Sequence, residues 1–218
     1  MRYFLIIFVA VLAVGCTAPS LKIDVPNLAE SSFLLVEDLR PPTEKENKAF
    51  SYSITSGAYG IYRRGDKLID PSPVRLLQHE IYKKYASESS FPKVKVHHLV
   101  VYNNLKSALR KSATGGILGG VVGALIVAGN QKHGIDVVAN LTTEEEFNSF
   151  EKEYQRALYT QEQNPNKVSV NKVYLEAELD GKRTFIMTMT PVELPKEVDK
   201  NSHVSAIETA IAYFLDQY

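Results

Sequence analysis

The stretch at residues 168–190, VSVNKVYLEAELDGKRTFIMTMT, decides the class of fold. Asp180-Gly181 separates two alternating apolar runs, 168–179 and 182–190, and this dipeptide is typical of a type I′ turn between paired strands. Pro191 follows the second run and ends it, because proline has no N–H to donate to a ladder. The stretch therefore predicts a long antiparallel hairpin.

Further strands are expected before this hairpin. Residues 93–102 (KVKVHHLVVY) alternate, which places Val94, Val96, His98, Val100 and Tyr102 on one face of a strand and Lys95, His97, Leu99 and Val101 on the other. Shorter apolar or β-prone runs predict strands at 32–37, 52–55, 58–62 and 135–141.

Three helices are expected. Ser72 is a suitable N-cap and Pro73 a suitable first residue for a helix that ends near residue 86. Thr143 and Glu146 form a capping box that opens a second helix. The apolar face of that second helix would carry Phe147, Phe150, Tyr154 and Leu158. A third amphipathic helix covers 204–218, capped near Ser202. The prediction is an α+β fold, with a mostly antiparallel sheet and two or three helices packed on one face.

The N-terminal stretch, MRYFLIIFVAVLAVGC, has the organisation of a secretory signal. Arg2 precedes an apolar run over 4–14, and Gly15-Cys16 follows as a small-residue cleavage site. Eleven residues reach about 16 Å as a helix, well short of the roughly 30 Å hydrocarbon core of a bilayer. We therefore expect a signal peptide over 1–15 rather than a permanent membrane span.

Residues 12–16, LAVGC, resemble the lipobox of bacterial lipoproteins, although Ala13 stands where that motif usually has Leu. The resemblance implies diacylation of Cys16, with palmitate-type chains anchoring the protein in a membrane. An ordinary signal peptide with a chance cysteine is the alternative. Thr17 rather than Asp follows the cysteine, which by resemblance to the lipoprotein sorting rule implies the outer membrane. We expect a lipidated tether over 16–31 and one periplasmic domain over 32–218.

Composition excludes several functional classes. The chain has 25 Lys and Arg against 25 Asp and Glu, which indicates neither a nucleic-acid footprint nor a polybasic membrane patch. Cys16 is the only cysteine, so a disulfide framework and a cysteine-based metal or redox site are excluded.

A glycine-rich apolar segment lies at 112–130. It carries the repeated small residues Gly115, Gly116, Gly119, Gly120 and Gly123, and no charge falls between 112 and 130. In a helix these glycines form a smooth stripe, a glycine zipper, on which a second helix can pack closely in lipid. Packing inside the domain, contact with a membrane or partner subunit, and a short membrane span all remain open.

Motifs for catalysis and cofactor binding are not found in the sequence. Gly119-Gly120 is followed by Val121-Val122 instead of the Lys-Ser/Thr of a phosphate-binding loop, so no nucleotide site is expected. His97 and His98 are strand neighbours that point to opposite faces, which disfavours a shared metal ion. His79 with Glu80 has no partner at metal-ligand spacing.

Two charged runs are interpreted as structural. The acidic run at 144–146 suits the first turn of a helix. Arg63-Arg64 has the charge to bind an anion, but an exposed basic turn over 63–66 is the preferred interpretation. We expect no cofactor, no metal ion and no enzymatic activity.

The order of features resembles small periplasmic lipoproteins of Gram-negative bacteria, especially the YajG-like type and the auxiliary lipoproteins of envelope lipid-transport ABC systems. The shared features are the lipobox, SFLLVEDLRP at 32–41, the glycine-containing turn, the helix from Pro73, VYLEAELDGKRTFIMTMTP at 173–191 and the closing helix. The segment 112–130 and the helix after it depart from that pattern.

The resemblance implies a non-catalytic outer-membrane lipoprotein that acts in envelope maintenance, or as an accessory to a transport or assembly system. Its partners would be the membrane, through Cys16, and an envelope protein or a second copy of the chain; nucleic acid and nucleotides are not expected. The alternatives are a membrane-inserting or oligomerising glycine-zipper protein and a carrier of a lipid or an anion.

Overall fold

The computed structural model describes residues 20–54, 57–106, 137–193 and 201–218. The predicted signal peptide, Cys16 and the glycine-rich segment with Gly115, Gly116, Gly119, Gly120 and Gly123 lie outside the described residues. The fold below therefore concerns the body of the predicted periplasmic domain.

The body is an α+β fold built on a seven-stranded sheet, which confirms the predicted class. The strand order is β3-β4-β6-β8-β9-β7, and β2 lies beside β6. The strands are β2 (Val36–Asp38), β3 (Lys48–Ile54), β4 (Gly57–Arg64), β6 (Val94–Lys106), β7 (Val138–Leu141), β8 (Val170–Leu179) and β9 (Lys182–Pro191). All the pairings are antiparallel except that of β2 with β6.

The predicted hairpin is strands β8 and β9. Their register runs without a break from Val170 opposite Pro191 to Leu179 opposite Lys182. Asp180 has φ of 49° and Gly181 has φ of 87°, the left-handed conformations that a type I′ turn requires at both central residues. Space around Gly181 is open, so its backbone conformation rather than crowding selects glycine.

Strand β6 differs from the expected alternation because it contains a bulge at His97. The register with β8 shifts between Val96 and His98, and one extra residue reverses the alternation of faces. As a result Val96 and Leu99 belong to the same core, whereas Val100 belongs to the other. The prediction that Val96, His98 and Val100 share a face is therefore wrong.

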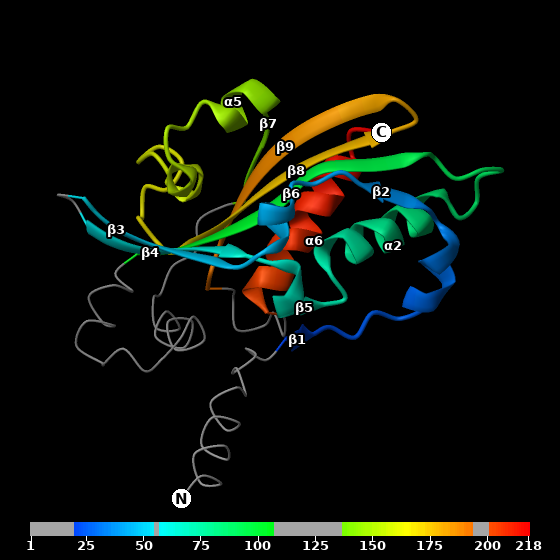
Figure 1. Ribbon diagram of the computed structural model, residues 1–218, viewed down its shortest axis with the longest axis horizontal. Helices are drawn as coiled ribbons and strands as arrows, with labels where there is room; N and C mark the ends of the chain where they lie inside the picture. Colours follow the sequence, from blue (N-terminus) through cyan, green and yellow to red (C-terminus); the bar gives the residue numbers. More distant parts are fainter. Residues whose placement is uncertain (1–19, 55–56, 107–136, 194–200) are drawn as a thin grey trace, which may run out of the picture.

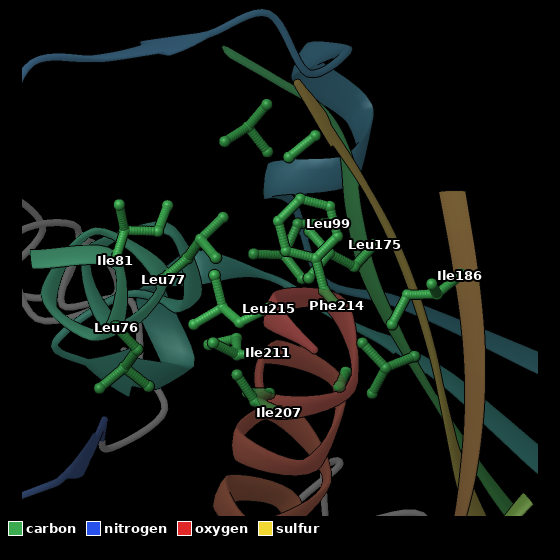
Figure 2. Packing of buried hydrophobic residues seen from close by; sticks show 14 of the residues in the cluster. Leu76, Leu77, Ile81, Leu99, Leu175, Ile186, Ile207, Ile211, Phe214 and Leu215 are labelled. Atoms are coloured by element: carbon green, nitrogen blue, oxygen red, sulfur yellow. The ribbon is translucent and has the colours of Figure 1, made fainter. Parts of the chain in front are cut away.

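Helices α2 (Pro73–Tyr85) and α6 (Ser202–Leu215) cover one face of the sheet, as predicted (Figure 1). The Ser72 side chain accepts a hydrogen bond from the Arg75 N–H at 3.3 Å, which confirms the predicted cap. Side chains of both helices meet β6, β8 and β9 in the larger core, as Figure 2 shows for Leu77, Ile81, Ile207, Ile211, Phe214, Leu99, Leu175 and Ile186. This face is called the helix face below.

The opposite face, called the outer face, carries a second and more aromatic core under α5 (Glu144–Asn148) and the 3₁₀ helix η4 (Glu153–Ala157). The capping box of Thr143 and Glu146 forms as predicted, but the expected single helix through Leu158 is interrupted after Asn148. Arg156 Nε donates to the Phe147 carbonyl at 2.9 Å. Side chains thus satisfy carbonyls that a longer helix would use.

Residues 21–31 are part of the body, which corrects the expected tether over 16–31. Strand β1 (Leu21–Lys22) pairs with β5 (Ile69–Asp70), and Ile23 and Val25 pack against the larger core. The 3₁₀ helix η1 (Leu28–Phe33) then occupies the start of the predicted strand at 32–37. Arg75 holds η1 through the Leu28 carbonyl and the Ser31 hydroxyl. Packing on α2 and on the larger core therefore orders a segment that mixes polar and apolar residues and contains Pro26.

Among the described helices, none combines the length and the hydrophobicity needed to cross a membrane.

Candidate functional site: buried ionic groups on the two faces of the sheet

Among the residues discussed from the sequence, Arg63 and Arg64 differ most from their predicted environment, which was an exposed turn. They are the last two residues of β4, paired with Tyr102 and Val101 of β6. Only 6% of Arg63 and 8% of Arg64 is exposed. The expected exposed basic turn is therefore wrong, because the strand continues through both arginines. Neighbours on a strand point to opposite faces, so the two guanidinium groups lie in different cores.

Arg63 is fully paired on the outer face. Its Nη1 donates to the Glu153 carboxylate, and its Nε donates to the Glu46 carbonyl at 3.1 Å. The hydroxyl of Tyr102 donates to the same carboxylate at 3.2 Å, and Lys48 Nζ lies 3.3 Å from it. The buried positive charge has an opposite charge and further hydrogen bonds around it, which is the arrangement that makes burial of an ion tolerable.

His98 is also paired on the outer face. Its Nδ1 lies 2.5 Å from a Glu44 oxygen, and its Nε2 lies 3.7 Å from a Glu176 oxygen. Arg183 Nε binds the other oxygen of Glu176 at 2.6 Å. The imidazole stacks on Phe185 with ring centroids 5.6 Å apart. His98 is thus a buried strand histidine, which agrees with the sequence interpretation.

The other candidates considered from sequence do not converge on a metal centre. His97 Nε2 lies 3.7 Å from Glu178, and His79 Nδ1 lies 3.1 Å from the Ser31 hydroxyl. Glu144 binds Arg183 at 3.0 Å from the first turn of α5. Within the part of the chain that the structure describes, no three His, Cys, Asp or Glu side chains are placed to hold a metal ion.

Arg40 occupies the gap between β2 and β4 along the edge of β6. Its side chain is 1% exposed and bonds Asp38 at 2.9 Å and Asp66 at 2.6 Å, and its Nη1 donates to the Leu99 carbonyl at 3.3 Å. Burial alone would raise the pKa of Asp38, but hydrogen bonds from Arg40 and Lys45 lower that pKa to about 2. Arg40 therefore bridges two carboxylates while it donates to an edge carbonyl, and Lys45 adds a second cation 3.0 Å from Asp38.

Lys172 is a buried cation that sequence reasoning did not single out. It lies on β8, is 4% exposed, and donates from Nζ to the Leu158 carbonyl at 2.6 Å. Burial lowers the pKa of Lys172 to about 8. The signal in the sequence was a lysine in the middle of a long apolar strand. Burial makes the ammonium easier to deprotonate, but at neutral pH Lys172 is still mostly charged.

The helix face carries a band of buried polar side chains beneath the start of α6. We call this band the polar belt; its members are Arg64, Asn103, Asn171, Thr188, Thr190 and His203, none more than 9% exposed. Asn103 Nδ2 donates to Asn171 Oδ1 at 2.7 Å, and Asn171 Nδ2 donates to the Ser202 carbonyl at 3.3 Å. This short chain of amides connects β6, β8 and the first residue of α6.

Most of the remaining polar atoms of the belt have no hydrogen-bond partner. These atoms are Arg64 Nε, Asn103 Oδ1, the hydroxyls of Thr188 and Thr190, and both ring nitrogens of His203. Buried polar atoms in native structures are almost always bonded, so these exceptions require an explanation. The rest of the body has unpartnered buried atoms too, among them Glu44 Oε2 and Glu176 Oε2 beside His98. The polar belt differs from the networks around Arg63 and Arg40 because its cation, Arg64, has no carboxylate partner among the described residues.

Burial perturbs both ionisable members of the belt. Desolvation, with a smaller contribution from the nearby Arg64 charge, lowers the pKa of His203 to about 3. Desolvation lowers the pKa of Arg64 to about 10, with only Tyr62 opposing it. At neutral pH His203 is therefore neutral and Arg64 is charged. The sequence signal for His203 was its position four residues before Ile207, which places it on the apolar face of α6.

A third feature is an apolar ridge on the N-terminal part of the body, made of Phe33, Leu35 and Leu39. Their exposed fractions are 59%, 86% and 47%. Phe33 packs edge-on against Tyr82 and Phe91, with ring centroids 5.8 and 5.3 Å apart. Leu35 and Leu39 flank the short strand β2. Large apolar side chains exposed within one short stretch of the surface are a feature of protein contact sites.

Comparison of the chain with protein-family models, with curated proteins and with solved structures found no match in any of the three.

Proposed function

We propose that the protein is a non-catalytic lipoprotein of the outer membrane, anchored through Cys16, whose periplasmic body acts through contacts with an envelope protein. The proposal includes a role in envelope maintenance or as an accessory to a transport or assembly system, as the resemblance to YajG-like lipoproteins implies. The observation that carries the contact role is the apolar ridge of Phe33, Leu35 and Leu39.

Because residues 21–31 belong to the folded body, only a short stretch of chain would separate the body from a lipid on Cys16. Only four residues separate Cys16 from Leu21, where β1 begins. Five residue steps extend at most about 18 Å, at 3.3–3.6 Å per residue. A lipid on Cys16 would therefore hold the β1–β5 side of the body close to the membrane surface. The proposed partner is then a protein of the same membrane or of the adjacent periplasm.

The paired networks of the outer face support a structural role for the conspicuous histidine and carboxylates. His98 is 8% exposed and lies between Glu44 and Glu176. Glu153 is shared by Arg63, Lys48 and Tyr102. Such groups hold elements together, and their charges are engaged by one another rather than presented to a substrate.

The anchor is tested by expressing the full chain in a Gram-negative host with a labelled palmitate analogue. We expect label on the wild-type chain and its recovery in the outer-membrane fraction. Cys16→Ser should lose both the label and the membrane association. A labelled Cys16→Ser chain, or an unlabelled wild type, would contradict the proposal.

The contact role is tested with a photo-crosslinking residue at Leu35 and, as a matched exposed control, at Glu151 on the outer face. We expect one crosslinked envelope protein from position 35 and none from position 151. Leu39→Asp in the same chain should abolish that crosslink without affecting folding, since Leu39 is half exposed. Equal crosslinking from both positions would reject the ridge as a contact surface.

The glycine-zipper alternative has a direct test of its own. Replacing Gly119 and Gly123 with Leu should abolish assembly if the segment 112–130 packs helix against helix in lipid. Unchanged assembly of this double variant in detergent would reject the alternative.

A further inference from the structure

Arg64 is a buried positive charge for which the described residues supply no counter-ion. It makes no ion pair and no hydrogen bond within the described part of the chain, although it is only 8% exposed. Guanidinium stays protonated under all ordinary conditions, so Arg64 keeps its charge in the buried position. Burial of an isolated charge is costly even after the surroundings relax. An anion beside Arg64 would compensate this charge.

The atoms around Arg64 match what an anion needs. Arg64 Nε carries an unpaired N–H, and a neutral His203 carries one N–H on an unpaired ring. The free hydroxyls of Thr188 and Thr190 lie on the same face of the sheet but on β9, which β6 and β8 separate from Arg64, so they are not part of this donor set. An anion with several acceptor oxygens would use donors that reach it from different directions, and a phosphate group has such oxygens.

The start of α6 adds a favourable field. The helix has 14 residues, long enough for its partial positive charge to concentrate at the first turn. His203 lies in that turn, and its backbone N–H donates to Asn201 Oδ1 at 2.9 Å. A cation such as Arg64 is unfavourable beside this helix end, whereas an anion between the two would be stabilised by both.

Two cavities elsewhere in the body give weaker reasons to expect a bound ligand. The cavity between residues 21–30 and helices α2 and α6 has a volume of about 730 Å³, but acidic and basic side chains mix on its wall and none of its lining residues has an orphaned buried atom. The smaller cavity of about 240 Å³ beside Lys172 contains a cation that is already bonded to Leu158.

We propose that Arg64, His203 and the first turn of α6 form a binding site for one phosphate-class anionic group, carried either by a free anion or by a lipid headgroup. Arg64 supplies the charge and His203 supplies a second donor. The amide chain from Asn103 to the Ser202 carbonyl fixes the start of α6 relative to the sheet. This site is independent of the proposed lipid anchor and of the apolar ridge.

The anion could be supplied in solution or as the headgroup of a lipid in a membrane, and the two sources can be tested separately. Residues 21–31, which a lipid on Cys16 would bring near the membrane, pack on the helix face together with α6. A headgroup is therefore a reasonable source, but a soluble anion would use the same donors. The experiment has one arm for each source.

The test uses the full chain in a maltoside detergent, which carries no phosphate, and measures thermal unfolding. One arm adds inorganic phosphate and the other adds phosphatidylglycerol as mixed micelles, both at constant ionic strength set with chloride. For the wild type we expect a rise in Tm of about 5 °C at saturation in at least one arm. Arg64→Met should lose that rise, and Arg64→Lys should keep part of it.

The matched control is Arg63→Lys, because Arg63 neighbours Arg64 in sequence and lies on the other face. It should keep the full rise in Tm. A rise with phosphate identifies a free anion, and a rise with phosphatidylglycerol alone identifies a headgroup. No rise in either arm, or an equal rise in Arg64→Met, overturns the proposal. General salt effects would appear equally in all variants.

Discussion

The two faces of the sheet differ in how their buried arginines are compensated. On the outer face Arg63 and His98 each have a carboxylate within ion-pair reach, and Arg183 neutralises Glu176. On the helix face Arg64 and His203 lie together without an acidic partner among the residues described. The difference teaches that burial of an arginine is not by itself a mark of function. The absence of compensation is the informative property.

The energetic reason is the asymmetry between paired and unpaired buried groups. A buried ion pair contributes little net stability, because desolvation offsets most of the attraction. Removing one partner, however, leaves the other uncompensated at a cost of several kcal/mol. Arg63 therefore belongs to a closed structural unit, while Arg64 is half of a unit whose other half is a ligand. Four measurements test this contrast.

The largest expected effect is acid destabilisation through His203. Its pKa is about 3 in the folded chain against about 6.5 when unfolded. Between these values the unfolded state binds a proton that the folded state does not, so stability falls as pH falls below 6.5. Urea unfolding in phosphate-free, carboxylate-free buffer should show a loss of about 2.3 kcal/mol from pH 6.5 to 4.5. His203→Gln should remove most of this loss; an unchanged profile would contradict it.

The next effect compares the two arginines directly. Arg63→Met leaves Glu153 without its main partner and should lower the free energy of unfolding by about 2 kcal/mol, a value moderated by the partial exposure of Glu153. Arg64→Met removes an uncompensated charge and should leave the anion-free chain equally stable or more stable by about 1 kcal/mol. Equal losses in the two variants, measured by urea unfolding without phosphate, would erase the contrast between the faces.

A third measurement concerns Lys172, the outer-face cation that can discharge. Its pKa is about 8 in the folded chain and about 10.4 unfolded, so the unfolded state binds more protons between these values. Stability should therefore rise by about 2 kcal/mol as pH increases from 8 to 10. Lys172→Met should flatten that rise and be more stable than wild type at pH 7. A rise that persists in the variant would show that Lys172 is not its source.

The smallest effect tests an orphaned hydroxyl of the polar belt. Thr188 is fully buried and its hydroxyl is unbonded. Thr188→Val keeps the shape and removes the unsatisfied group, so we expect a gain of about 1 kcal/mol. Thr209→Val is the control, because the Thr209 hydroxyl donates to the Ser205 carbonyl at 2.7 Å. A loss of stability in Thr188→Val would mean that its hydroxyl has a partner in solution.

Local signals in the sequence predicted much of the fold. Asp180-Gly181 specified its turn because few residue pairs adopt two consecutive left-handed conformations. The capping box of Thr143 and Glu146 and the Ser72-Pro73 start were equally local. The bulge at His97 was not predictable, because the alternating pattern is compatible with both a regular and a bulged strand. The pairing with β8 sets the register and so decides between them. The order of residues 21–31 likewise depends on α2.

The buried ionic groups also have some properties that the sequence predicts and others that depend on the fold. The sequence by itself determined that Arg63 and Arg64 are adjacent cations at the end of a β-prone run, that His203 shares a face with Ile207, and that Lys172 interrupts an apolar strand. Only the tertiary structure decided that Arg63 meets Glu153, ninety positions away in the chain, and that Arg64 meets no carboxylate within the described residues. Compensation of charge depends on which distant segments come together. The residues next to an arginine in the chain do not indicate which distant carboxylate it will meet. The difference between the paired Arg63 and the unpaired Arg64 is therefore visible only in the folded sheet.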